Sequence, residues 1–183
     1  MVFLQCSFKS EALQMEQALN IILPQIPMSD DARKNEVKKR GFPVLYLLHG
    51  LSDDHSGWMR KSCIERYSRD YNLAVVMPNV NRSSYADMRY GLNYYTYMTK
   101  EIPNFITTNF PISNRREDNY IAGLSMGGYG AFMIALRNPH MFSAAASLSG
   151  ALDLSYKFDI PESELEMMTK TLFGSREEFL NSD

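Results

Sequence analysis

A serine flanked by glycines carries the clearest chemical signal in the sequence. Ser125 lies in the segment Gly123-Leu124-Ser125-Met126-Gly127, which follows a short apolar run and opens a helical pattern. A serine at a sharp turn between a strand and a helix exposes its hydroxyl, and this setting is typical of the nucleophile in acyl-transfer enzymes. We therefore predict that Ser125 attacks the carbonyl carbon of an acyl ester.

Glycines recur at positions 127, 128 and 130, in the first turns of the helix that is expected after Ser125. Each of them costs a helix about 1 kcal/mol relative to alanine. Helix stability alone does not explain this pattern, whereas close packing of the helix on a sheet does. We expect the helix to lie tightly against the sheet that carries the serine.

Two backbone N–H groups are candidates for the oxyanion hole, the set of donors that stabilises the charged intermediate of acyl transfer. The N–H of Met126 follows the nucleophile at the start of a helix, where N–H groups are free and the helix dipole is positive. The second donor should come from the loop after the apolar run 44–48. There Gly50 permits a sharp exit from the strand, and the N–H of Leu51 is the candidate.

Three side chains near this loop have no assigned chemistry. His49 and His55 are interpreted as residues that shape the loop or line the pocket, because no third metal ligand stands at a recognisable spacing. Trp58 is expected either to line the acyl pocket or to pack in the core. The spacing of the histidines therefore predicts no metal site.

A histidine base and a carboxylate that orients it are also needed to activate a serine. His140, the one histidine after Ser125, follows the expected helix, and a rise of 1.5 Å per residue puts it roughly 20 Å from the nucleophile. We expect it on the surface. His55 stays open as a base that has moved to another loop, and Asp153 follows a predicted strand and is placed to line the site.

The elements that position these residues alternate between strands and helices. Continuous apolar runs at 44–48 and 73–77 are typical of strands that are covered on both faces, and the segment between them, 60–70, is helix-like. Further expected elements are a helix within 92–107, a strand at 120–122, a helix at 126–137, a strand at 144–148, a helix at 162–171 and a helix that begins with a capping box at Ser175. Strands at 2–8 and 18–23 should form an entry hairpin, and the charged stretch 27–41 is expected to be a solvated loop.

Composition excludes several classes of function. The chain has 183 residues, 45% of them hydrophobic, and a formal net charge of −2, so it should form one globular domain without electrostatic attraction to nucleic acid. Its start lacks the features of a secretory signal and no segment is apolar over the length of a membrane span, which predicts a cytoplasmic protein without membrane partners. Cys6 and Cys63 have no Cys-X-X-Cys partner and are interpreted as small hydrophobic residues.

Three segments carry a resemblance to a known family: LLHGLSDDH at 47–55, IAGLSMGGYG at 121–130 and ASLSGA at 146–151. They resemble the tributyrin esterases of lactic and streptococcal bacteria, which are grouped with esterase D, the S-formylglutathione hydrolases and the mycolyltransferases. The resemblance implies an α/β-hydrolase fold, a three-layer sandwich with a mostly parallel central sheet, and hydrolysis of short-chain acyl esters without a cofactor. It also supports Ser125 as nucleophile and the N–H groups of Leu51 and Met126 as the oxyanion hole.

The same resemblance implies that the acid and the histidine follow on loops after two further strands, which this sequence does not contain. We expect residues 1–183 to be a single domain that lacks the last strands at its C-terminus, and the strand at 144–148 to be an unprotected sheet edge. The leading interpretation is a serine carboxylesterase that acts on a small acyl ester. The alternatives are an S-formylglutathione-type thioesterase, an acyltransferase, or a catalytically inactive remnant; the sequence does not determine the oligomeric state.

Overall fold

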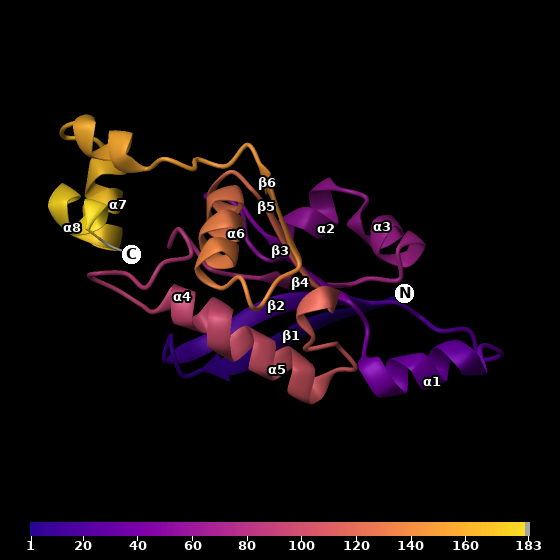
Figure 1. Cartoon of the computed structure of the whole chain (residues 1–183). Coiled ribbons are helices and arrows are strands. Elements are labelled where there is room, and N and C mark those ends of the chain that lie inside the picture. Colours follow the sequence, from indigo (N-terminus) through magenta and orange to yellow (C-terminus); the bar gives the residue numbers. More distant parts are fainter. Residues whose placement is uncertain (182–183) are drawn as a thin grey trace.

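A six-stranded sheet runs through the middle of the computed structural model, which describes residues 1–181 (Figure 1). Its strands are β1 (Val2–Ser10), β2 (Met15–Leu23), β3 (Val44–Leu48), β4 (Ala74–Pro78), β5 (Asn119–Leu124) and β6 (Ala144–Leu148). They lie in the order β1-β2-β4-β3-β5-β6. The β1–β2 hairpin joins the sheet antiparallel to β4, and the other four strands are parallel. The mostly parallel sheet and the entry hairpin are confirmed.

The helices of the described residues fill the connections between the strands. They are α1 (Asp31–Arg40), α2 (Gly57–Lys61), α3 (Ile64–Asp70), α4 (Tyr94–Thr96), α5 (Ile102–Asn109), α6 (Met126–Arg137), α7 (Glu164–Phe173) and α8 (Arg176–Leu180), with a π-helical turn at Tyr97–Glu101 and 3-10 turns at Arg116–Asp118 and Ser155–Asp159. None of the helices within residues 1–181 combines the length and the apolar character that a membrane span requires.

Alternate residues of the buried strands face different helices. Tyr46 and Leu48 of β3 belong to the larger core cluster, which also contains residues of α5 and α6 such as Ile106 and Ile134. Leu47 points to the opposite face, where the smaller cluster receives Ile64 of α3. The sheet is therefore covered by helices on both faces, which confirms the three-layer sandwich and explains why residues 44–48 show no polar alternation.

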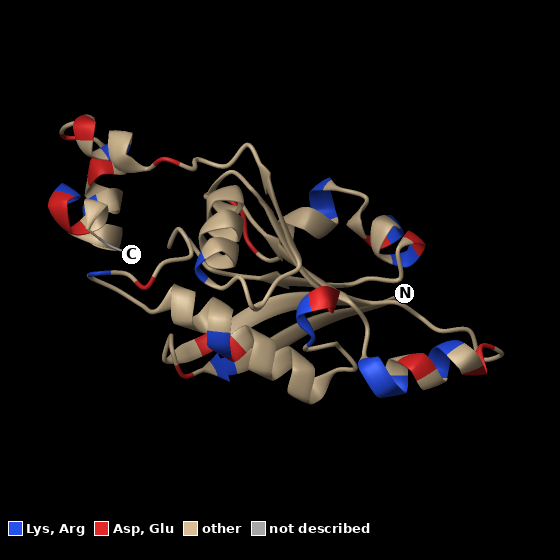
Figure 2. Ribbon diagram, viewed as in Figure 1, with Lys and Arg blue, Asp and Glu red and all other residues tan. Residues whose placement is uncertain are grey.

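The prediction of a loop at 27–41 is wrong, because residues 31–40 form α1. Asp30 caps the helix by accepting a hydrogen bond from the N–H of Arg33 at 2.9 Å, and the helix ends at Gly41, whose φ is +78°. Acidic Asp31 lies in the first turn and three basic residues lie in the last, which complements the helix dipole; Figure 2 shows the mixed charges. Val37 is the one buried residue of α1, so the helix has no apolar stripe that a search for hydrophobic periodicity detects.

Two other helical predictions need correction in detail. The segment 60–70 is not one helix, since Ser62 is extended (φ −143°, ψ 174°) and separates α2 from α3. The stretch 92–107 is helical from Tyr94, but its middle is a π-helical turn that ends two residues before Pro103, which has no N–H to close an α-helical turn. The helix at 126–137 and the strand at 144–148 have the predicted bounds.

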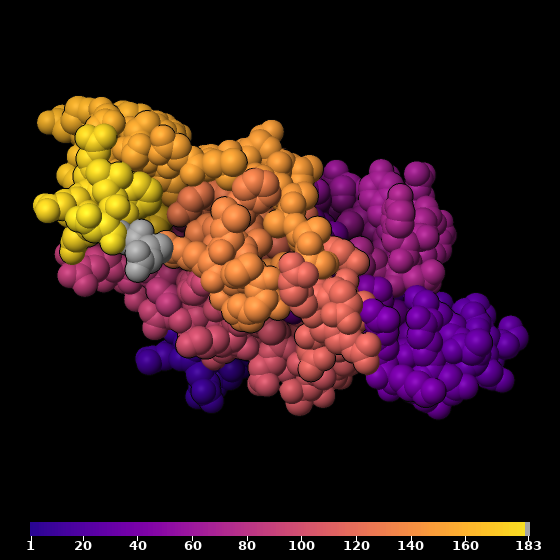
Figure 3. Space-filling view, in the orientation of Figure 1, coloured from indigo at the N-terminus to yellow at the C-terminus, as the bar shows by residue number. Residues whose placement is uncertain are grey.

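The end of the described chain forms a separate layer at one corner of the molecule. We call residues 155–181, with α7 and α8, the C-terminal lobe; it lies against the segment that follows β4 (Figure 3). The N–H groups of Arg89 and Tyr90 donate to carbonyl oxygens of Leu172 and Thr171 at 2.8 and 3.1 Å. The strand β6 is the last of the sheet within residues 1–181, and four of its five residues are exposed, as expected for an uncovered edge.

Candidate active site

Ser125 occupies the turn between β5 and α6. Its backbone has φ +55° and ψ −115°, a strained conformation for a residue with a side chain, and the residue is exposed. Its N–H donates to the carbonyl oxygen of Leu148 at 2.9 Å, which anchors the turn to the end of β6. The structure thus places Ser125 in the strand, turn and helix setting that the sequence predicts, with its side chain accessible.

The glycines around Ser125 are required by backbone contacts. A Cβ on Gly127 would lie 2.4 Å from the carbonyl oxygen of Leu48, and one on Gly123 would lie 2.2 Å from the carbonyl oxygen of Gly127. A Cβ on Gly128 would meet the backbone of Gly150 at 2.9 Å. These distances confirm that α6 packs on the sheet too closely for a larger residue.

Ser125 lines a small pocket with a volume of about 50 Å³. The other walls come from the segments that follow β3, β4, β5 and β6, all at the carboxyl ends of the parallel strands: Leu51, Ser84, Met126, Tyr129, Ala151, Leu154 and Lys157. The predicted residues Ser125, Leu51 and Met126 are therefore brought together. Within residues 1–181, neither the N–H of Leu51 nor that of Met126 donates a hydrogen bond to another group of the chain.

A buried histidine fixes the direction of the Leu51 N–H. The Nε2 atom of His49 accepts a hydrogen bond from the N–H of Val80 at 3.1 Å, so the neutral ring carries its proton on Nδ1. Nδ1 then donates to the carbonyl oxygen of Gly50 at 2.8 Å, and that oxygen also accepts from the N–H of Asp53 at 3.1 Å. In a trans peptide the carbonyl oxygen and the next N–H point in opposite directions, so the Leu51 N–H is turned away from His49.

The surroundings of His49 favour the neutral form that this arrangement needs. Burial lowers the pKa of His49, although its contact with the Gly50 carbonyl opposes this shift. The hydroxyl of the fully buried Tyr85 donates to the carbonyl oxygen of His49 at 2.9 Å. His49 therefore shapes the loop, which is the first of the two roles that the sequence predicts for it.

The other candidate residues do not line the pocket of Ser125. His140 is exposed in the turn after α6, as expected, and Asp153 is exposed with its carboxylate accepting a hydrogen bond from the N–H of Ser155 at 2.8 Å. The Nδ1 atom of His55 is buried without a partner in the described part of the chain. Trp58 donates to the carbonyl oxygen of Leu48 at 3.0 Å and packs on the smaller core cluster, which favours its packing role. In residues 1–181 no histidine hydrogen-bonds to Ser125.

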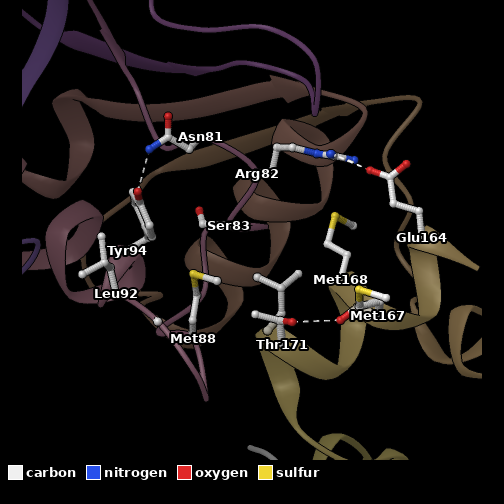
Figure 4. A pocket seen from close by; sticks show the side chains of 12 residues that line it. Asn81, Arg82, Ser83, Met88, Leu92, Tyr94, Glu164, Met167, Met168 and Thr171 are labelled. Atoms are coloured by element: carbon white, nitrogen blue, oxygen red, sulfur yellow. Dashed lines mark hydrogen bonds and ion pairs between the residues drawn. The ribbon is translucent and has the colours of Figure 1, made fainter.

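A larger cavity of about 450 Å³ lies between α7 and the segment that follows β4 (Figure 4). Three methionines and Leu92 contribute to its apolar lining, while two pairs of polar side chains bond to each other: Arg82 with Glu164 at 2.6 Å and Asn81 with Tyr94 at 2.7 Å. The cavity does not include Ser125 or any histidine. Its lining offers no activated nucleophile, so the smaller pocket is the candidate active site.

The pocket also contains Ser84 and Lys157, which were not predicted from the sequence. Neither belongs to a recognisable pattern, and both reach the pocket through tertiary packing. Both cysteines were expected to be small hydrophobic residues, but Cys63 is exposed at the start of α3. Cys6 is half-buried, and burial raises the pKa of its thiol.

Comparison with known proteins gives a consistent result. Residues 10–181 match the family model described as "Putative esterase". The chain is 33% identical over 163 residues to an acetyl esterase of Caldicellulosiruptor saccharolyticus, which covers 88% of this chain and 61% of that protein.

Two solved structures from Staphylococcus aureus are similar over nearly the whole chain. The fluorophosphonate-binding serine hydrolase FphF, with substrate bound, has a TM-score of 0.83 and 35% identity over 95% of this chain and 66% of its own. The S-formylglutathione hydrolase FrmB has a TM-score of 0.79 and 35% identity over 96% and 67%. The chain therefore spans about two thirds of the length of these similar proteins.

Proposed function

Because this chain belongs to the esterase family that matches residues 10–181, we propose that it carries the nucleophile and oxyanion hole of a serine carboxylesterase for short-chain acyl esters. One observation supports the proposal above all. The strained, exposed Ser125 shares a pocket with Leu51 and Met126, whose backbone N–H groups have no partner within residues 1–181. Similarity to an acetyl esterase points to the same reaction class.

In this proposal Ser125 Oγ attacks the ester carbonyl carbon and the alcohol leaves, which forms an acyl-serine that water then hydrolyses. The N–H groups of Leu51 and Met126 donate to the oxyanion of each tetrahedral intermediate. The pocket is small, with a volume of about 50 Å³, which favours a short acyl group.

We further propose that the histidine and the acid of the triad lie outside these 183 residues, in one domain with them. Support comes from the pocket of Ser125, whose described lining includes no histidine or carboxylate. The chain also spans only 61% of the similar acetyl esterase. On this proposal the 183-residue form keeps roughly 10³ to 10⁴-fold acceleration over water, from the oxyanion hole and binding alone. An intact mass of the native protein equal to 21.0 kDa, with full esterase activity, would contradict it.

A fluorophosphonate probe tests the role of Ser125. We expect covalent labelling of the native protein, in which the histidine and the acid activate the serine hydroxyl, and no labelling of its Ser125→Ala variant. Ser84→Ala is the matched control, since Ser84 lines the same pocket and its variant should keep the label. Absence of labelling in the wild type would favour the inactive remnant, and labelling of Ser125→Ala would exclude Ser125 as the nucleophile.

An S-formylglutathione-type thioesterase is the second candidate, and the similarity to FrmB favours it. Rates on p-nitrophenyl acetate, on esters with longer acyl chains and on S-formylglutathione discriminate between the two, and transfer of the acyl group to an added alcohol identifies an acyltransferase. A cytoplasmic location stays a prediction, and fractionation of cells that express the native protein tests it.

A further inference from the structure

Lys157 brings a positive charge to the pocket of Ser125. It lies on the 3-10 turn Ser155–Asp159 at the start of the C-terminal lobe and lines the pocket together with the nucleophile. The other lining residues in the described chain are apolar or carry hydroxyl groups, and none is a carboxylate or a second cation. Lys157 is thus the charged side chain of this pocket.

No group within residues 1–181 neutralises the ammonium of Lys157. By contrast, two exposed lysines are paired: Lys61 forms an ion pair with Asp53, and Lys170 lies 2.8 Å from Glu166. Lys157 has neither an ion pair nor a side-chain hydrogen bond in that range. Burial lowers the pKa of its half-buried ammonium, and no anionic neighbour opposes this shift.

A half-buried cation without a partner loses hydration and gains no attraction in return. The cost would be recovered if an anion bound beside it, because charge-assisted hydrogen bonds strengthen where water is partly excluded. Neither the proposed reaction nor an ion pair within residues 1–181 uses Lys157, so in the described chain its charge is available to the substrate. Its place in the same pocket as Ser125 limits that anion to a group near the scissile bond.

We propose that Lys157 binds a carboxylate of the substrate, and that the preferred substrates are short acyl esters or thioesters that carry a carboxylate close to the scissile bond. This inference rests on the proposed esterase function. The carboxylate belongs either to the acyl group or to the leaving group, and both arrangements offer the same ammonium–carboxylate contact. The alternative role, a lysine base that takes the proton of Ser125, predicts no preference for anionic substrates.

Hydrolysis rates of three esters test this proposal: neutral p-nitrophenyl acetate, 4-acetoxybenzoate with the carboxylate on the leaving group, and mono-p-nitrophenyl succinate with the carboxylate on the acyl group. In Lys157→Met we expect the ratio of kcat/KM for one carboxylate-bearing ester to that for the neutral ester to fall about tenfold. Lys157→Arg should restore most of the ratio, and Lys157→Glu should reduce it further. Lys170→Met, which removes a paired lysine of the same lobe, should leave it unchanged.

Binding to Ser125→Ala gives an answer that does not depend on turnover. The probes are amides of matched shape: neutral acetanilide, 4-acetamidobenzoate and N-phenylsuccinamate, titrated while chemical shifts of pocket residues are followed. We expect one anionic amide to bind about tenfold more tightly than acetanilide, and Lys157→Met in the same background to abolish the difference. The anion that shows the difference identifies the side of the scissile bond that Lys157 contacts.

The outcomes separate the two proposals. Loss of fluorophosphonate labelling at Ser125 overturns the esterase function, whereas the amide titration still decides the role of Lys157. Equal affinity for neutral and anionic amides, or a preference that survives in Lys157→Met, overturns the carboxylate site. Loss of turnover of all three esters in Lys157→Met with an unchanged preference, together with loss of the rise in rate with pH that accompanies deprotonation of a base, would instead identify a lysine base.

Discussion

The turn at Ser125 and the C-terminal lobe are held in place by different kinds of contact. Around Ser125, backbone meets backbone at van der Waals distance: a Cβ on Gly127 would lie 2.4 Å from a carbonyl oxygen of β3. The lobe is attached through two backbone hydrogen bonds to residues 89 and 90 and through ion pairs with exposed side chains, such as Arg82–Glu164 and Arg89–Glu178.

This difference suggests that the two regions contribute differently to the proposed function. The close-packed region supplies Ser125 and both predicted oxyanion donors, whose positions must be accurate to a fraction of an ångström. The lobe supplies Lys157, and recognition of a charged group tolerates more displacement than bond making does. The proposed reaction is thus built on the rigid part of the fold, and the proposed selectivity on the part with fewer and weaker contacts.

The largest effect is expected from Gly127→Ala. The new methyl group overlaps the carbonyl groups of Leu48 and His49, and backbone cannot move aside as a flexible side chain does. We expect a loss of at least about 3 kcal/mol in the free energy of unfolding, measured by urea denaturation. Gly50→Ala is the control, because its methyl group would meet its nearest atoms at 3.6 Å or more; a loss below about 1 kcal/mol in Gly127→Ala would show that the region is not rigid.

A smaller effect is expected from His49→Gln. Without the Nδ1–H group the Gly50 carbonyl keeps only its hydrogen bond from the N–H of Asp53, so the Gly50–Leu51 peptide is held less firmly, and we expect the rate of fluorophosphonate labelling of the folded protein to fall about 10 to 100-fold. His49→Asn should recover part of the rate, since its amide N–H₂ reaches the same carbonyl. Labelling of the folded His49→Gln protein at the wild-type rate would exclude this positioning role, whatever the change in stability.

The smallest effect is expected from Arg82→Gln, which removes an ion pair between the segment that follows β4 and Glu164 of the lobe. The side chain of Arg82 is 55% exposed and that of its partner Glu164 is 74% exposed, so solvent screens their attraction. We expect the free energy of unfolding to change by less than about 0.5 kcal/mol, and labelling of Ser125 to continue at the wild-type rate. A loss above about 1 kcal/mol in urea denaturation would show that this ion pair holds the lobe more firmly than its exposure indicates.

Local patterns predicted the strands and the turn because their determinants are local. An apolar run without alternation identifies β3, and the Gly-X-Ser-X-Gly segment after another apolar run identifies the start of α6. The helix α1 was not predicted because its stability comes from Asp30 at one end, basic residues at the other and Gly41 beyond, and not from an apolar face. Signals at the two ends of a helix predict it less strongly than an apolar face does, and in α1 only Val37 is buried.

The sequence by itself determined the fold class, because strands and helices alternate along the chain. It also predicted Ser125 as the nucleophile and two segments as the source of the N–H groups, because each of these predictions depends on a local sequence pattern. Only the tertiary structure decided how His49 orients the Gly50–Leu51 peptide, since Val80 and Tyr85 are brought to it from the segment after another strand. It alone placed Lys157 beside Ser125. A single lysine belongs to no sequence pattern that predicts a role. The role proposed for Lys157 depends on the absence of a counter-charge around it in the described chain.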